Sequence, residues 1–93
     1  MKCRKKPIVI DAYQLTRDEY RSYVFLGIFM NAPDWLRDSR DITTSNGTIC
    51  IKTLEGKMKV KEGDYIMRGV DGELYPCDAS IFERTYEVVE DDV

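Results

Sequence analysis

The sequence contains no histidine. Histidine is the usual general acid or base in catalysis and a very common metal ligand, so both kinds of site lack their usual residue. The chain also lacks a Ser/His/Asp or Cys/His arrangement, a glycine-rich phosphate-binding loop and metal-ligand spacing. We therefore expect no catalytic residues, no metal and no cofactor, and we predict that the protein is not an enzyme.

Cysteine is scarce, and the three cysteines, Cys3, Cys50 and Cys77, form an odd set without CxxC spacing. Disulfide frameworks normally use an even number. The basic N-terminus is not followed by an apolar segment of the secretory type, so we expect reduced thiols and a cytoplasmic location. Cys77 could act as a nucleophile, but without a histidine base we expect a buried, inert thiol.

No hydrophobic run is long enough to cross a bilayer, which takes about 20 residues. The most apolar run extends from Ser22 to Met30 and is interrupted by Gly27. We favour a buried helix that packs on a sheet. A strand is one alternative, and an exposed apolar surface that joins copies into a homo-oligomer is another.

Neither sign of charge dominates, because the formal net charge is -3. This value argues against a strongly basic, nucleic-acid-binding protein. The charges are nevertheless sorted, with Lys2, Arg4, Lys5 and Lys6 near the start and Glu87, Glu90, Asp91 and Asp92 near the end. We interpret both ends as solvated, with a basic arm that contacts an acidic partner or a phosphate as the alternative.

The first half of the chain predicts a strand and two helices. Apolar residues alternate over Lys6–Leu15, which places Ile8, Ile10 and Ala12 on one face against the core. Thr16 to Glu19 has the capping-box pattern, with the Glu19 carboxylate reaching back to the Thr16 amide. The helix that follows would carry its apolar side chains at helical spacing: Tyr20, Tyr23, Val24, Phe25 and Ile28. Pro33 and Asp34 start a second, short helix in which Trp35 is a core anchor.

The second half predicts antiparallel strands. Asn46-Gly47 is a hairpin turn between Ile42-Thr43 and Thr48–Thr53, with Ile49 and Ile51 on one face. Alternation over residues 57–61 places Met58 and Val60 inward and Lys57, Lys59 and Lys61 on one outer face. Lysines on an outer face prevent edge-to-edge aggregation, or they can bind an anion.

The next hairpin joins Tyr65–Val70 to Glu73–Cys77 through a two-residue Asp71-Gly72 turn. This register places Arg68 opposite Tyr75, within reach of the Tyr75 ring or of Glu73. Asp78 then caps a helical turn with Ile81 and Phe82, and Thr85 to Val89 forms a last strand. The predicted fold is a single α+β domain of residues 1–93: an N-terminal strand, one or two short helices, and an antiparallel meander that can curl into a small barrel-like sheet.

One long motif runs from Gly63 to Glu87: GDYIMRGVDGELYPCDASIFERTYE. It closely resembles a C-terminal signature of small proteins encoded by bacteriophages and prophages, in which a GD-aromatic-I strand precedes an RG turn, GE-x-YPC and IF-x-x-TYE. The N-terminal KKPIVIDAYQ and the Pro-Asp-Trp-Leu step are also similar, and Arg17 to Met30 matches least. The resemblance implies a binding role only as a class, because small phage proteins often inhibit a host enzyme, block a defence complex or sequester a signalling nucleotide.

From this resemblance we predict a phage-encoded protein that acts in the host bacterial cytoplasm and inhibits an anti-phage defence system by binding a host protein. A sponge for a small anionic nucleotide or second messenger is one alternative, and an assembly or structural accessory of the phage particle is another. The predicted contact surface consists of polar and aromatic residues: Arg68, Glu73, Tyr75, Asp78 and Tyr86. Lysines would contribute if the ligand is anionic: Lys57, Lys59 and Lys61.

Overall fold

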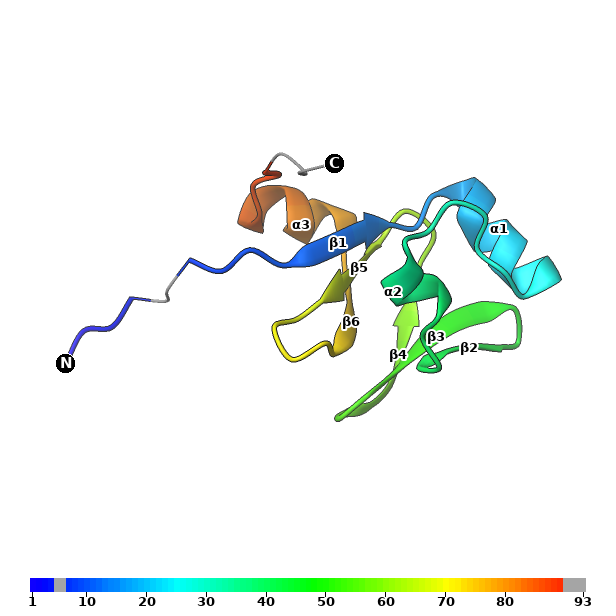
Figure 1. Cartoon of the computed structure of the whole chain (residues 1–93), viewed down its shortest axis with the longest axis horizontal. Coiled ribbons are helices and arrows are strands. Elements are labelled where there is room, and N and C mark those ends of the chain that lie inside the picture. The colour runs from blue at the N-terminus through cyan, green and yellow to red at the C-terminus, as the bar shows by residue number, and fades with distance from the viewer. Residues whose placement is uncertain (5–6, 90–93) are drawn as a thin grey trace.

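The computed structural model describes residues 1–4 and 7–89. Its elements are β1 (Asp11–Gln14), α1 (Arg17–Leu26), α2 (Asp34–Arg37), β2 (Ile42–Ser45), β3 (Thr48–Thr53), β4 (Gly56–Val60), β5 (Tyr65–Arg68), β6 (Leu74–Cys77) and α3 (Ala79–Thr85). The strands form two three-stranded antiparallel sheets, ordered β1-β5-β6 and β2-β3-β4 (Figure 1). The α+β prediction is confirmed, but within the described residues the strands do not close into a barrel.

Both sheets contribute to one hydrophobic core, which α1 and α2 cover. The core consists of Leu15, Phe29, Ala32, Leu36, Ile42, Ile49, Ile51, Val60, Ile66 and Leu74. Tyr20, Tyr23 and Val24 of α1 pack against it at helical spacing, and Trp35 of α2 packs beside Leu36. Trp35 is only partly buried, so it covers the core and Leu36 is the residue that fills it.

The β2–β3 hairpin agrees with its prediction. Asn46 and Gly47 have φ angles of 52° and 76°, which a two-residue hairpin turn of this type requires. Ile49 and Ile51 are fully buried. On β4, Val60 is also fully buried, but Met58 is 38% exposed. Met58 lies opposite the buried Ile51, so it shares the inward face with Val60 as predicted, but it is only partly covered.

The N-terminal strand is shorter than predicted. The prediction covered residues 6–15, of which Lys6 lies outside the described residues, and β1 comprises only Asp11–Gln14. Asp11 pairs with Arg68, the last residue of β5, so residues before Asp11 have no strand beside them. Ile8 and Ala12 are exposed, whereas Tyr13 packs against the core. The prediction that the face with Ile8 and Ala12 is buried is therefore wrong.

The β5–β6 register also differs by one residue from the prediction. Arg68 lies opposite Leu74, and Met67 lies opposite Tyr75. The Gly69 amide donates to the Glu73 carbonyl at 2.8 Å, so the connecting turn is longer than the two residues Asp71-Gly72. A shift of one residue moves a side chain to the other face of the sheet. The predicted contact of Arg68 with Tyr75 or Glu73 is therefore wrong, and Arg68 instead lies 3.6 Å from a carboxylate oxygen of Asp11.

The last predicted strand, over residues 85–89, is also wrong. Helix α3 extends to Thr85, and residues 86–89 belong to no strand. The ring of Phe82 stacks on Tyr65 with centroids 3.7 Å apart. This contact packs α3 against β5, and residues 86–89 follow it without strand pairing.

The prediction that residues 22–30 are buried is wrong for most of this segment. Helix α1 ends at Leu26 because Gly27 adopts the left-handed conformation, with φ 74°, and its amide donates to the Tyr23 carbonyl. Ser22 and Phe29 are buried. The exposed hydrophobic side chains are Phe25, Leu26, Ile28 and Met30. The alternative of an exposed apolar surface describes this segment better.

Half of the predicted capping box is present. The Thr16 hydroxyl accepts from the Glu19 amide at 3.5 Å, as expected for a helix N-terminus. The Glu19 carboxylate does not reach back to the Thr16 amide. It is buried, and it accepts hydrogen bonds from the Tyr13 hydroxyl at 3.1 Å, the Met30 amide at 2.7 Å and the Asn31 amide at 3.1 Å.

Replacing this buried carboxylate should destabilise the protein strongly. In Glu19→Ala, the Met30 and Asn31 amides and the Tyr13 hydroxyl lose their acceptor, and we expect a loss of about 3 kcal/mol in the free energy of unfolding. Urea denaturation followed by circular dichroism measures the change. Asp18→Ala, an exposed neighbour on the same helix turn, is the matched control and should cost less than about 1 kcal/mol. Equal effects of the two substitutions would contradict this role of Glu19.

Candidate functional site

A groove lies between the ends of two hairpins, β3–β4 and β5–β6, one from each sheet. We call it the inter-sheet groove, and its volume is about 560 Å³. Its lining combines apolar and charged residues: Asp41, Lys52, Thr53, Leu54, Glu55, Met58, Glu73, Leu74, Tyr75 and Pro76. A lining that combines apolar and charged side chains also occurs in surfaces that bind other proteins.

The β3–β4 turn presents the exposed apolar part of the groove. The Thr53 hydroxyl accepts from the Glu55 amide at 3.2 Å and donates to the Gly56 carbonyl at 2.7 Å, which holds the turn in one conformation. Leu54 lies at this turn and is fully exposed. An isobutyl group that stays in water contributes nothing to folding, so it is available for burial against a partner.

Glu73 lines the groove and is held in place by its own turn. Its carboxylate accepts from the Asp71 amide at 3.1 Å, and its carbonyl accepts from the Gly69 amide. A Cβ atom at Gly69 would lie 1.6 Å from a Glu73 carboxylate oxygen, so only glycine leaves the carboxylate in this place. The one-residue change in register therefore brings Glu73 to the groove, away from Arg68.

Tyr75 lines the groove and connects it to the aromatic residues under α3. Burial, and then a hydrogen bond with Tyr86, raises the pKa of Tyr75 to about 12. The Tyr86 ring in turn stacks on Phe82 at 5.3 Å, and Phe82 stacks on Tyr65. Tyr86 therefore does not line the groove and acts on it only through Tyr75.

The raised pKa predicts how stability depends on alkaline pH. The Tyr75 phenol ionises near pH 10 in the unfolded chain and near 12 in the folded protein, so its contribution is complete below pH 10 and is lost between 10 and 12. In Tyr75→Phe the free energy of unfolding should decline less steeply over this range. Urea denaturation at closely spaced pH values tests this.

Tyr13→Phe is the matched variant on the far side of the sheet, because burial and the Glu19 hydrogen bond also raise the pKa of Tyr13 to about 12. It should flatten the same part of the profile independently. A Tyr75→Phe profile that runs parallel to the wild-type profile would show that Tyr75 ionises normally.

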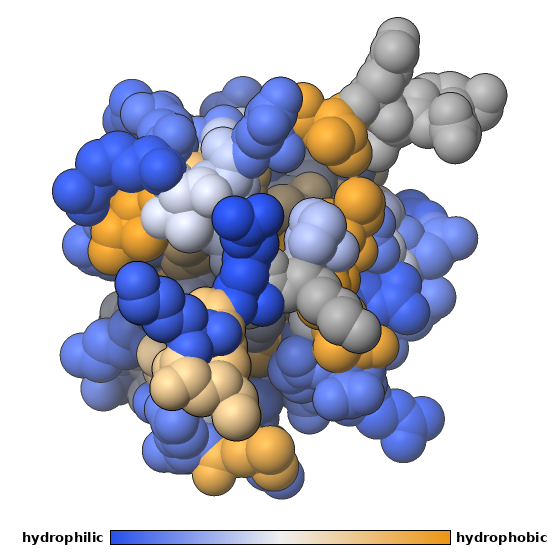
Figure 2. Space-filling view, turned by 90° about the vertical axis from the view of Figure 1, so that its left-hand side faces the viewer, coloured by the Kyte–Doolittle hydropathy of each residue, from blue (hydrophilic) through white to orange (hydrophobic). Residues whose placement is uncertain are grey.

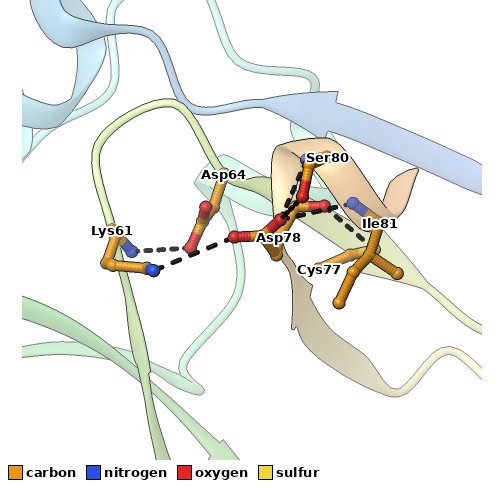
Figure 3. A network of polar contacts seen from close by, with 6 residues as sticks. All are labelled: Lys61, Asp64, Cys77, Asp78, Ser80 and Ile81. Carbon is orange, nitrogen blue, oxygen red and sulfur yellow. Dashed lines mark hydrogen bonds and ion pairs between the residues drawn. The ribbon is translucent and has the colours of Figure 1, made fainter. Parts of the chain in front are cut away.

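Asp78 and Lys61 belong to a different arrangement, shown in Figure 3. The Asp78 carboxylate caps α3 by accepting from the Ser80 amide at 2.9 Å and the Ile81 amide at 3.2 Å. Hydrogen bonds from Ser80 lower its pKa, and the Lys61 ammonium lies 3.8 Å away. The Lys61 amide donates to the buried carboxylate of Asp64. These contacts join α3 to the β4–β5 connection, so both predicted site residues have a structural role here.

Cys77 is the cysteine nearest to these carboxylates. Burial raises the pKa of its thiol, and the negative charges of Asp78 and Asp64 raise it further. The thiol is therefore protonated at neutral pH, which disfavours a role as a nucleophile. Within the described residues, no three histidine, cysteine or acidic side chains come together as a group that could hold a metal ion.

A row of lysines is present on one sheet, but its residues differ in part from the predicted ones. Lys52 on β3 lies directly opposite Lys57 on β4, and Lys59 lies opposite Cys50, so Lys52, Lys57 and Lys59 share the outer face of this sheet. In the part of the chain that the structure describes, none of these three lysines forms an ion pair. Lys61 is not part of this row, because its ammonium group lies near the Asp78 carboxylate.

The predicted contact residues thus lie in four places. Glu73 and Tyr75 line the groove, with Tyr86 behind them. Lys57 and Lys59 lie on the outer face of one sheet, Asp78 caps α3 and pairs with Lys61, and Arg68 pairs with Asp11. Sequence reasoning missed Leu54 and Met58. A large apolar side chain directly before the Glu55-Gly56 turn was the available signal for Leu54, because turns normally carry polar residues.

No protein-family model matches the chain, and no curated protein or solved structure is significantly similar to it. None of the helices in residues 1–4 and 7–89 is both long and apolar enough to cross a membrane.

Proposed function

We propose that this protein is a small phage-encoded binding protein that acts in the host bacterial cytoplasm and inhibits an anti-phage defence system by binding a host protein. The inter-sheet groove is the observation that supports a protein partner. It offers Leu54 and Met58 unburied, beside the partly buried Tyr75, with charged groups around them. A partner that inserts an apolar side chain would bury these groups, and its polar groups would face Lys52 and Glu73 at the rim.

The phage context of the proposal comes from the resemblance of residues 63–87 to small proteins of bacteriophages and prophages. The groove supports the mode of action. Leu54 and Glu55 lie in one turn and Glu73 in another, so two separate segments present these side chains to a common partner. Binding through this surface would not require any chemical step.

Capture from a bacterial lysate tests the groove as the contact surface. Immobilised wild-type protein should retain a host protein, and Leu54→Ser should reduce its recovery at least about tenfold, because Leu54 contributes to an interface and not to the core. Leu26→Ser, which also replaces an exposed leucine, is the matched control and should retain the partner. Quantitative mass spectrometry measures recovery. Equal recovery by wild type and Leu54→Ser would refute the groove as the binding site.

The inhibitory part of the proposal has a separate readout. A bacterium that carries one defence system should form more phage plaques when it expresses the wild-type protein, and the increase should disappear with Leu54→Ser and persist with Leu26→Ser. A host partner captured through Leu54 without any change in plaque number in a panel of defence systems would support binding and contradict inhibition of those systems.

A nucleotide sponge is the second candidate, and the lysine row is the observation that favours it. Lys52 and Lys57 lie directly opposite each other, and like charges in this position destabilise a sheet. A bound phosphate group would remove this repulsion and would place its charge within reach of Lys59. A small anionic nucleotide or second messenger fits this surface.

Thermal unfolding separates this candidate from the first. At a ligand concentration of ~100 times the dissociation constant, a cyclic or ADP-ribose-type nucleotide should add about 2.7 kcal/mol to stability. That gain raises the melting temperature of a domain of this size by roughly 10 °C or more. The double variant Lys57→Ala/Lys59→Ala should lose the shift. Arg17→Ala/Arg21→Ala has the same change in net charge and should keep it, and no shift with any nucleotide would exclude the sponge.

A further inference from the structure

The charges that line the inter-sheet groove are mostly negative. Asp41, Glu55 and Glu73 contribute three carboxylates, and Lys52 is the one cationic side chain among the described residues of the lining. The whole chain is much better balanced, with 17 acidic and 14 basic residues. The groove is therefore more acidic than the protein as a whole, and a partner that enters it meets negative charge.

The ion pairs of residues 1–4 and 7–89 do not neutralise these carboxylates. They use other acidic residues: Asp11, Asp34 and Asp78. The three acidic residues of the groove are exposed. The Glu73 carboxylate accepts from the Asp71 amide, but a carboxylate has about four acceptor positions, so Glu73 can accept from a partner as well.

The negative charges come from both walls of the groove. Asp41 directly precedes β2 and Glu55 lies in the β3–β4 turn, so both belong to the wall that the β2-β3-β4 sheet forms. The Asp41 carbonyl accepts from the Lys52 amide at 2.8 Å, which fixes Asp41 beside β3. Glu73 directly precedes β6 in the opposite wall. A segment that lies between the walls therefore has carboxylates on both sides.

The exposed apolar surface on this side of the molecule is divided. Figure 2 shows the side on which the β5–β6 hairpin lies in Figure 1, and separate hydrophobic areas lie there between hydrophilic ones. In the groove, Leu54 is fully exposed and Met58 is 38% exposed, and both line it together with the three carboxylates. A purely apolar segment would bury these carboxylates without a partner, which is unfavourable.

We propose that the inter-sheet groove binds a basic segment of the protein partner, in which a large apolar side chain is flanked by lysine or arginine. This inference rests on the proposed function, because it names the chemistry of the partner at the same site. The apolar side chain would cover Leu54 and Met58, and the cations would pair with Glu55 and Glu73 from the two walls. Arginine can also stack its guanidinium group on an aromatic ring, which Tyr75 supplies.

The charges argue against an acidic or phosphorylated segment in this groove. Such a segment would bring like charges together, and like-charge contacts across an interface reject wrong partners. The lysine row is a separate surface, since Lys57 and Lys59 do not line the groove. An anionic ligand would therefore bind on the outer face of the β2-β3-β4 sheet, whereas the groove matches a cationic segment.

Selection from a peptide library tests the chemistry of the segment. Random short peptides displayed on yeast are sorted for binding to the wild-type protein. The selected peptides should combine a large apolar residue with lysine or arginine, and Asp41→Lys/Glu55→Lys should bind them at least about tenfold more weakly. Glu73 is left unchanged in this variant because its carboxylate also holds its own turn.

Glu62→Lys/Glu83→Lys is the matched control. It makes the same change in net charge at two exposed glutamates outside the groove, so it should bind the selected peptides normally. Circular dichroism should show the same spectrum for both double variants and the wild type. Asp41→Asn/Glu55→Gln removes the charges without reversing them, so it should slow association and make the association rate less sensitive to salt.

The outcomes separate this inference from the proposed function. Peptides that depend on Leu54 but lack lysine and arginine would overturn the inference and leave the groove as the binding site. Basic peptides that Asp41→Lys/Glu55→Lys binds as well as the wild type does would have the same meaning. Peptides that Leu54→Ser binds equally well would instead contradict the groove itself. A library without any binder would overturn the basic segment, and capture from a lysate would still test the proposed function.

Discussion

The buried carboxylate of Glu19 is the contact on which the arrangement of the first half of the chain depends. It accepts hydrogen bonds from Tyr13 beside the sheet and from two backbone amides in the connection between α1 and α2. An unpaired charge at this depth would destabilise the fold, and three donors compensate for it. The network fixes how α1 and the approach to α2 sit against β1. It also returns the chain from Gly27 to the core, where Phe29 and Ala32 are buried.

The second half depends on a change of sheet between β4 and β5. The Asp64 carboxylate accepts from the Lys61 amide, and the Asp64 carbonyl accepts from the Leu15 amide, so this turn is tied to the end of β1. The chain consequently leaves the β2-β3-β4 sheet and pairs with β1. The ends of the two hairpins then lie next to each other with the inter-sheet groove between them. The groove is therefore a result of topology, since its two walls come from different sheets.

Exposed apolar side chains occur at several separate places: residues 8 and 9, the end of α1, and the β3–β4 turn. A small chain buries a limited fraction of its surface, so isolated exposed residues are ordinary. Those beside a groove or along a free strand edge are different, because another chain can cover them with matching shape or hydrogen bonds. The proposed partner site uses the β3–β4 turn, which lies beside the inter-sheet groove.

Local signals in the sequence determined the turns, helix starts and strands whose conformation depends on neighbouring residues. Asn46-Gly47 dictates its turn through positive φ angles, Thr16 and Asp78 cap their helices, and alternation identifies β3 and the lysine face. Tertiary structure decided which strands pair, how long the β5–β6 turn is, and where the Glu19 carboxylate goes, because these depend on residues far apart in the chain. The candidate site divides in the same way: Glu73 and Tyr75 were found from the motif, but Leu54 and Met58 become a surface only when two sheets place their hairpins side by side. Burial follows from what the rest of the chain covers: Phe29 is buried, whereas Ile8, Val9, Phe25, Leu26, Ile28 and Met30 stay exposed.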